Sequence, residues 1–315
     1  MTSSPARFRS ILVPLDGSPL AEQAIPLALA IAERARSKVK LVLVHQPLFL
    51  MEPGPAYTKI ELGMQKADRE YLRSVVARLR EGLGRALSSA VLKGPVARTL
   101  ARYISELGTD LVVMTTHGRG GVRRAWLGSV ADQLIRTSEV PILVVRPGES
   151  NTAESSVDLA EILVPLDGSP LAEAVLEPAA ALARLWDAGI SLVQVVRPVV
   201  LTSDPLLPFP TGYSDQSTAM RRESAQDYIR DVSERLRESG VKASGVAVIG
   251  AGIADTLLNL ARPERVSLVA VATHGRGGLR RLALGSVADK LVRAAEVPVL
   301  VVRPTARRSR RRTSS

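Results

Sequence analysis

The chain has 315 residues, which favours two domains over one, and 46% of them are hydrophobic, enough to build substantial cores. It contains no cysteine, which excludes disulfides, thiolate metal ligands and thiol nucleophiles. Its formal net charge is +11, and such a positive charge can favour binding to nucleic acid or to anionic lipid. No apolar run has the roughly 18 residues that a membrane span needs, and the first residues lack a signal-peptide core. We therefore expect a cytoplasmic protein that does not associate with membranes.

An internal repeat sets the organisation of the chain. Residues 11–22 read Ile-Leu-Val-Pro-Leu-Asp-Gly-Ser-Pro-Leu-Ala-Glu and recur without change as residues 162–173, an offset of 151. Later in the repeat His117 matches His274 at an offset of 157, so the second copy holds six more residues. We place the length change between about residues 48 and 67, opposite the proline-rich stretch 198–214, because loops tolerate insertions.

In chain order, apolar strand-like runs alternate with helical patterns in both copies. In the first copy the predicted strands are 9–15, 39–45, 88–93, 110–116 and 141–146, and the predicted helices are 19–36, 61–81, 97–107 and 129–138. In the second copy the predicted strands are 161–167, 190–196, 244–249, 267–273 and 298–303. Ser18 and Pro19 suit the N-cap and first position of the first helix. This alternation predicts two parallel, doubly wound α/β sheets with right-handed crossovers. We assign residues 1–150 to the first domain, 158–304 to the second, and 305–315 to a basic tail.

One stretch in each copy has the composition of an anion site. After the fourth predicted strand, residues 116–121 read Thr-His-Gly-Arg-Gly-Gly, and residues 128–132 read Gly-Ser-Val-Ala-Asp; both recur from residue 273 onward. A strand, a glycine-rich loop and a helix start expose backbone N–H groups beside the positive end of a helix dipole. Asp16 and Asp167 follow the first strand of each copy. If the first and fourth strands are neighbours, loop and aspartate face one crevice at the switch point of the sheet.

Three signatures in the same order make each half resemble a universal stress protein domain. They are Val-Pro-x-Asp-Gly-Ser, the glycine motif, and a terminal Val-Pro-x-Leu-Val-Val-Arg-Pro, over about residues 7–147 and 158–304. The ATP-binding branch of that family has glycines spaced by two and nine residues, followed by Ser or Thr. The later part of this motif is present in both halves, whereas Thr115 and Ala272 replace its first glycine.

The resemblance implies a five-stranded parallel sheet of order 3-2-1-4-5, the adenine-nucleotide alpha hydrolase-like fold, in two tandem copies. It implies that the halves pair through their last strands as an internal pseudo-dimer, which leaves open whether a second chain pairs with it as a homodimer. It also implies that ATP is bound, with Mg²⁺ or Mn²⁺ on its phosphates. The nucleotide-binding residues of the first half would be Pro14, Leu15, Asp16, Gln46, Met114, Thr115, His117, Gly118, Arg119, Gly128, Ser129 and Val130. Those of the second half would be Pro165, Leu166, Asp167, Arg197, Ala272, His274, Gly275, Arg276, Gly285, Ser286 and Val287.

Structural interpretations of the same residues stay open. Ser129 with Asp132, and Ser286 with Asp289, also spell a capping box, with serine at the N-cap and an acid three positions later. Asp16 can hydrogen-bond within its own turn. The arginine pairs of the glycine loops either steer phosphate or are solvated; they are Arg123, Arg124, Arg280 and Arg281. We expect His45 to be an ordinary strand residue, since Val196 stands opposite it in the repeat.

Several classes of functional site are missing from the sequence. There is no Gly-Lys-Ser/Thr loop, no His/Cys/Asp/Glu cluster typical of a metal site, and no nucleophile elbow around Ser129. The arginine-rich tail has no interleaved aromatic residues, so we do not expect it to bind single-stranded nucleic acid. We expect a nucleotide-binding stress-response or regulatory protein that is not an enzyme, with ATP as a structural or signalling ligand. The alternative is an interaction module whose pockets are vestigial.

Overall fold

The structure is a computed structural model that describes residues 8–47, 54–83, 86–116, 127–146, 157–201, 212–262, 264–273 and 284–304. The first half contains β1 (Ser10–Leu15), α1 (Pro19–Glu22), α2 (Ile25–Ala35), β2 (Lys38–His45), α3 (Pro55–Leu83), β3 (Leu87–Lys93), α4 (Val96–Leu107), β4 (Leu111–Thr115), α5 (Ser129–Thr137) and β5 (Ile142–Val145). The second half contains β6 (Glu161–Pro165), η2 (Ala172–Val175), α6 (Leu176–Trp186), β7 (Gly189–Val196), β8 (Val200–Leu201), β9 (Gly212–Tyr213), α7 (Asp215–Glu238), β10 (Ala243–Ile249), α8 (Ile253–Leu260), β11 (Leu268–Ala272), α9 (Ser286–Ala294) and β12 (Val299–Val302).

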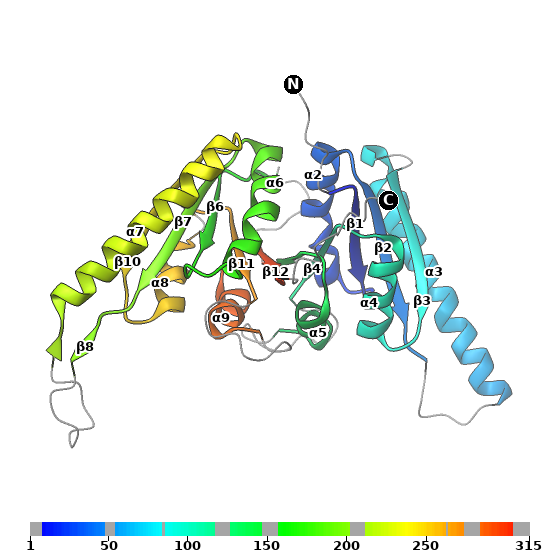
Figure 1. Ribbon diagram of the computed structural model, residues 1–315. Coiled ribbons are helices and arrows are strands. Elements are labelled where there is room, and N and C mark those ends of the chain that lie inside the picture. Colours follow the sequence, from blue (N-terminus) through cyan, green and yellow to red (C-terminus); the bar gives the residue numbers. More distant parts are fainter. Residues whose placement is uncertain are drawn as a thin grey trace, which may run out of the picture.

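All ten long strands belong to one sheet of order β10-β7-β6-β11-β12-β5-β4-β1-β2-β3 (Figure 1). Within each half the strands are parallel and follow the predicted order 3-2-1-4-5. The two halves join where β12 pairs antiparallel with β5, with Leu300 opposite Leu143. The expected pairing of the last strands is therefore confirmed.

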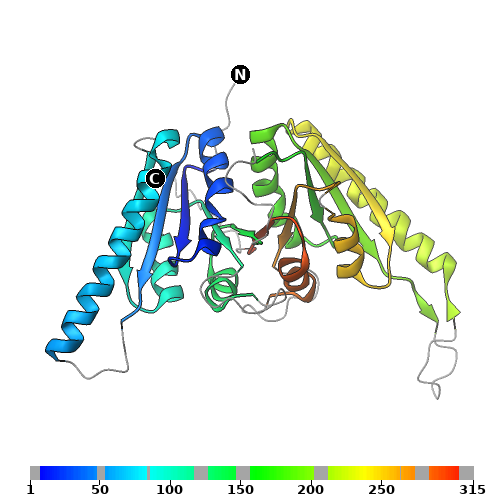
Figure 2. The same cartoon turned by 180° about the vertical axis from the view of Figure 1, so that it is seen from behind.

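Helices cover both faces of the sheet, as a doubly wound fold requires. Ile11, Val13 and Leu15 of β1 pack on one side with α2 and α3, whereas Leu12 packs on the other with α4 and α5. In the second half α6 and α7 take the first side, and α8 and α9 take the second. At the centre, α2 and α6 lie above the sheet and α5 and α9 lie below it (Figures 1 and 2).

The predicted single helix over residues 19–36 is wrong. It is divided into α1 and α2, and the break lies at Gln23 and Ala24. Pro26 explains the break, because it has no N–H to donate to the carbonyl of Glu22 and its ring clashes with that carbonyl. The predicted cap at the start is correct: Ser18 is the N-cap and its side chain accepts a hydrogen bond from Ala21 N–H.

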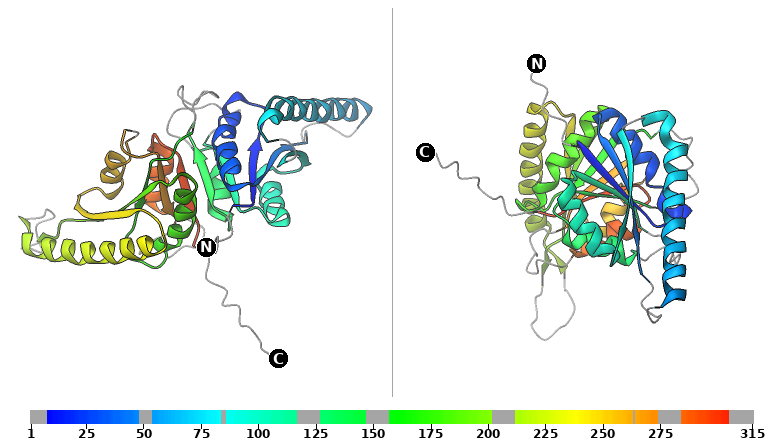
Figure 3. Two further views of the ribbon diagram at one scale, coloured as in Figure 1. Left: turned by 90° about the horizontal axis from the view of Figure 1, so that it is seen from above. Right: turned by 90° about the vertical axis from the view of Figure 1, so that its right-hand side faces the viewer.

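The length change between the halves lies beside the two longest helices. In the second half β8 and β9 form a short antiparallel ribbon before α7, an element that the proline-rich stretch did not predict. The helix α3 has 29 residues and α7 has 24, and viewed from above they lie at the two outer ends of the molecule (Figure 3). Among the described helices, none combines the length and the apolar character needed to cross a membrane.

Candidate functional site

The first and fourth strands of each half are neighbours, so the switch point lies where the sequence places the aspartate and the glycine loop. In the first half Ile11 is paired with Leu111, and in the second Ile162 is paired with Leu268. Continuing these registers by five residues sets Asp16 level with Thr116 and Asp167 level with Thr273. The carboxyl ends of β1 and β4 therefore lie side by side at the switch point, which is where ligands bind in open α/β sheets.

The two aspartates are held by their own turns. Asp16 Oδ1 accepts hydrogen bonds from Ser18 N–H at 2.9 Å and from the Ser18 hydroxyl at 2.6 Å. Asp167 Oδ1 makes the same pair with Ser169, at 3.0 and 2.6 Å. The interpretation that Asp16 bonds within its turn is thus confirmed. It is compatible with ligand contact, because a carboxylate offers about four lone-pair sites and both aspartates are only partly buried.

The capping-box interpretation of Ser129 and Ser286 is wrong. Gly128 and Gly285 are the N-caps of α5 and α9, so each serine is the first helical residue, and its side chain is exposed. Among the described residues no side chain caps either helix.

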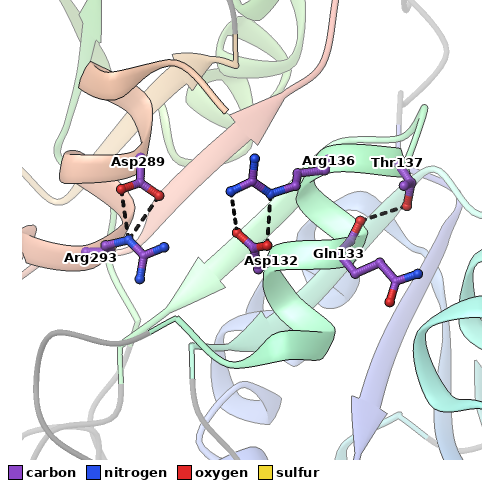
Figure 4. Close-up of polar contacts among 6 residues, drawn as sticks. All are labelled: Asp132, Gln133, Arg136, Thr137, Asp289 and Arg293. Carbon is purple, nitrogen blue, oxygen red and sulfur yellow. Dashed lines mark hydrogen bonds and ion pairs between the residues drawn. The ribbon is translucent and has the colours of Figure 1, made fainter. Parts of the chain in front are cut away.

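The acids that would complete those boxes are engaged elsewhere. Asp132 pairs with Arg136 at 2.8 Å and Asp289 pairs with Arg293 at 2.9 Å, one turn further along each helix (Figure 4). An uncapped helix start leaves first-turn N–H groups to an outside acceptor, and an anion is the acceptor that the helix dipole favours.

Both ends of each glycine-rich loop are fixed at the same point. Gly128 N–H donates to Thr116 O at 2.8 Å, and Gly285 N–H donates to Thr273 O at 2.9 Å. A Cβ added to Gly285 would lie 3.0 Å from that Thr273 oxygen, so a side chain there would force the strand end or the helix start to shift by a few tenths of an ångström. These bonds close each loop at the end of its strand, beside the aspartate turn.

The remaining predicted residues are placed unevenly. Pro14 and Leu15 end β1, and Pro165 ends β6 with Leu166 directly after it, next to the aspartates. Met114, Thr115 and Ala272 are buried at the ends of β4 and β11. Gln46 and Arg197 are exposed just past β2 and β7, and Val130 and Val287 are half-buried in the first turns of α5 and α9. The predicted residues of the two glycine loops lie outside the described residues: His117, Gly118, Arg119, His274, Gly275 and Arg276, together with Arg123, Arg124, Arg280 and Arg281.

A buried charged cluster beside the first site was missed, because His45 had been interpreted as an ordinary strand residue. The His45 ring is buried at the end of β2, with Nδ1 2.7 Å from Asp68 Oδ2 and Nε2 3.1 Å from Glu61 Oε1. Lys93 Nζ lies 2.9 Å from the same Glu61 oxygen, and this hydrogen bond lowers the pKa of the Glu61 carboxyl, against the effect of burial. The helical spacing of the acids Glu61 and Asp68 was the sequence signal that could have revealed this cluster.

The second half replaces this cluster with neutral residues. Val196, Thr218 and Ala225 occupy the positions of His45, Glu61 and Asp68, and Val196 packs with Ala225 and Ala247. The two candidate sites therefore share their aspartate turns and helix starts but differ in the neighbouring strand and helix. Among the described residues, no group of three or more His, Cys, Asp or Glu side chains has metal-binding geometry.

Comparison with known proteins gives the same division of the chain. Residues 7–146 and 160–303 each match the universal stress protein family. A universal stress protein of Mycobacterium tuberculosis is 27% identical over 316 residues, covering 96% of this chain and 99% of that protein. Another from Mycolicibacterium smegmatis is 29% identical over 304 residues, covering 93% and 97%. The tandem arrangement is thus shared along the whole length.

Solved structures agree on the fold. The crystal structure of a putative universal stress protein from Pseudomonas aeruginosa superposes with a TM-score of 0.64 at 16% identity, covering 94% of both chains. One from Archaeoglobus fulgidus gives the same TM-score at 16% identity, covering 93% of this chain and 96% of that one. With both halves matching the family and the two-domain fold matching its structures, the chain belongs to the universal stress protein family.

Proposed function

We propose that each half of the chain binds ATP at its switch point and that the protein uses the nucleotide as a structural or signalling ligand in a stress response. The observation that carries the proposal is the pairing of two features, present in both halves. Each uncapped helix start, at Gly128 or Gly285, follows a loop closed at the end of the fourth strand. Each aspartate turn lies on the neighbouring first strand.

Different residues would bind the three parts of the ligand, which are the phosphates, the ribose and the base. First-turn N–H groups of α5 and α9, with the glycine loops, would bind the phosphates. The carboxylates of Asp16 and Asp167 would accept hydrogen bonds from ribose hydroxyls while keeping their turn bonds. The backbone beside Leu15 and Gln46, and beside Leu166 and Arg197, would meet the base. Mg²⁺ or Mn²⁺ would enter on the phosphates, since these ions prefer oxygen ligands.

We further propose that the protein binds ATP without efficient turnover. The sequence lacks a Gly-Lys-Ser/Thr loop, and the first-turn serines of α5 and α9 have no nucleophile-elbow context. Steady-state phosphate release from ATP tests this part separately. Turnover of about 1 s⁻¹ or faster, the ordinary range for enzymes, would make the protein an ATPase instead.

Equilibrium dialysis with labelled ATP tests the binding proposal. Wild-type protein should bind saturably below millimolar nucleotide, and Asp16→Ala and Asp167→Ala should each weaken one site by about tenfold, the value of a charge-assisted hydrogen bond. Asp227→Ala is the matched control, because Asp227 is an exposed acid on α7 that pairs with Arg230. Absence of saturable binding, together with no thermal stabilisation by nucleotide, would favour the interaction module with vestigial pockets.

A further inference from the structure

A tyrosine, a glutamate and an arginine form the same contact set in both halves, apart from the residues assigned to the nucleotide. Tyr71 of α3 donates its hydroxyl hydrogen to Glu22 at 2.9 Å, and Arg78 lies 2.5 Å from the other oxygen of that carboxylate. In the second half Tyr228 donates to Glu173 at 3.0 Å and Arg235 donates to it at 2.8 Å. In each half, both carboxylate oxygens of the glutamate are thus bonded by side chains of one long helix.

The contact set is maintained across the length change between the halves. Glu22 and Glu173 are separated by 151 residues, whereas Tyr71 and Tyr228 are separated by 157. The six-residue difference falls in the connection between the glutamate and the tyrosine, so the loop changes while the contact remains. Even the local helix type differs, since Glu22 ends the α-helix α1 and Glu173 lies in the 3-10 helix η2.

Two hydrogen bonds connect the residue before each glutamate to the site aspartate. Ser18 caps α1, its Oγ accepting from Ala21 N–H at 3.2 Å, and the same hydroxyl donates to Asp16. Glu22 is the next residue after Ala21. The second half repeats this with Ser169 and Ala172, also at 3.2 Å. The glutamate thus lies next in sequence to the turn that holds the aspartate, and contacts the long helix.

Burial and nearby carboxylates keep both tyrosines protonated. Burial, followed by the hydrogen bond to Glu22, raises the pKa of Tyr71 well above its usual range, and the charge of Asp16 raises it further. Burial and the charge of Glu173 act in the same way on Tyr228, with Asp167 adding to the shift. Each tyrosine thus stays a neutral hydrogen-bond donor at physiological pH.

We propose that Tyr71 and Tyr228 are positioning residues for the two nucleotide sites, each fixing the aspartate turn of its own half against the long helix by way of Glu22 or Glu173. This inference rests on the proposed function, because the aspartates are its point of contact with the ligand. The tyrosines themselves do not touch nucleotide. Groups that fix a binding side chain in its productive orientation reduce the ordering that a ligand must otherwise impose.

Tyr71→Phe and Tyr228→Phe, each in the full chain, test the proposal in two measurements. Hydrogen–deuterium exchange without nucleotide should show faster exchange at residues 16–22 in Tyr71→Phe and at 167–173 in Tyr228→Phe, with the other half unchanged. Site-resolved ATP affinity should fall about fivefold in the altered half alone. Tyr103→Phe is the control, since Tyr103 packs against the core on α4, on the opposite face of the sheet.

Two glutamate variants separate positioning from simple loss of stability. Glu22→Gln keeps an oxygen that accepts from Tyr71 and should retain near wild-type affinity, whereas Glu22→Ala should match or exceed the loss in Tyr71→Phe. A lower melting temperature with unchanged exchange at 16–22 and unchanged affinity would overturn the proposal and leave a structural contact. If wild-type protein binds no ATP, the proposed function fails and the nucleotide role with it, while the exchange measurement still decides whether Tyr71 holds the turn.

Discussion

At the residue scale, the pKa values of the half-buried Tyr71 and Tyr228 can be measured directly. Burial and the neighbouring carboxylates raise the pKa of Tyr71 and of Tyr228 above the value of about 10 that a tyrosine has in an unfolded chain. Between those values the folded protein keeps a proton that the unfolded chain has lost. The contribution of both residues to stability is therefore complete below about pH 10 and declines as the pH rises further.

We expect absorbance titration of tyrosinate to show a late phase that disappears in the variant Tyr71→Phe with Tyr228→Phe. The same variant should lose less stability between pH 9 and pH 11 than wild-type protein, measured by urea unfolding, because two late-titrating groups are gone. Titration of every tyrosine in one phase near pH 10 would contradict the half-buried, carboxylate-bound placement of these two hydroxyls.

At the element scale, α3 and α7 are held to the sheet by different chemistry. His45, Glu61, Asp68 and Lys93 join α3 to β2 and β3. In the second half, Gln226 of α7 joins β10 through neutral hydrogen bonds, and Val196 packs with Ala225. Removing one member of a buried charged cluster leaves its partners uncompensated, but replacing all of them by packed neutral residues does not. The neutral residues of the second half therefore provide a natural control for substitutions in the cluster of the first half.

We expect His45→Val alone to lower the melting temperature, because Asp68 and Glu61 lose their contacts with the buried imidazole, at 2.7 and 3.1 Å. The triple variant His45→Val, Glu61→Thr, Asp68→Ala, which copies the second half, should recover most of the loss. It should also resist acid better, since the pKa of Glu61 is lowered in the folded protein and its contribution is lost as the pH falls through that value. If the triple variant were less stable than the single one, the neutral residues of the second half could not take the place of the charged cluster in the first.

The elements also show what the sequence can and cannot predict. Strand positions and order were predictable, because continuous apolar runs and the family resemblance agree. The break before Pro26 was missed although proline rules predict it, because α1 and α2 share one apolar pattern. Placing Ser129 at the N-cap failed because Gly128 can also begin a helix, and only backbone geometry decides between them. The environment of His45 depends on α3 packing across the sheet edge, which local spacing does not encode.

At the scale of the whole molecule, one continuous sheet runs through both halves. Leu143 and Leu300 face each other across the antiparallel junction and neither is exposed to solvent. Contacts on both sides reinforce it, with Arg146 donating to Ala294 O at 3.2 Å, Arg303 donating to Thr137 O at 3.1 Å, and Arg34 stacked over the Trp186 ring at 4.5 Å. The halves should therefore unfold together rather than as independent domains.

We expect Leu300→Ala to cost about 3 kcal/mol, the usual range for a buried leucine, and to affect both halves in one cooperative transition. Leu171→Ala is the matched control at an exposed leucine and should cost less than about 0.5 kcal/mol. Chemical denaturation followed by hydrogen exchange in each half measures both values. Two separated transitions in wild-type protein would contradict the continuous sheet as a single cooperative unit.

The central claim is that the duplicated switch points are two nucleotide sites, and counting bound ATP by native mass spectrometry tests it most directly. With ATP held near the wild-type Kd, where a tenfold weaker site is mostly empty, we predict up to two ATP molecules on each wild-type chain and on the Asp227→Ala control. We predict at most one on most molecules of Asp16→Ala or Asp167→Ala, and none on most molecules of the double variant. Absence of ATP on wild-type protein at millimolar nucleotide, or an undiminished count on the double variant, would contradict the account.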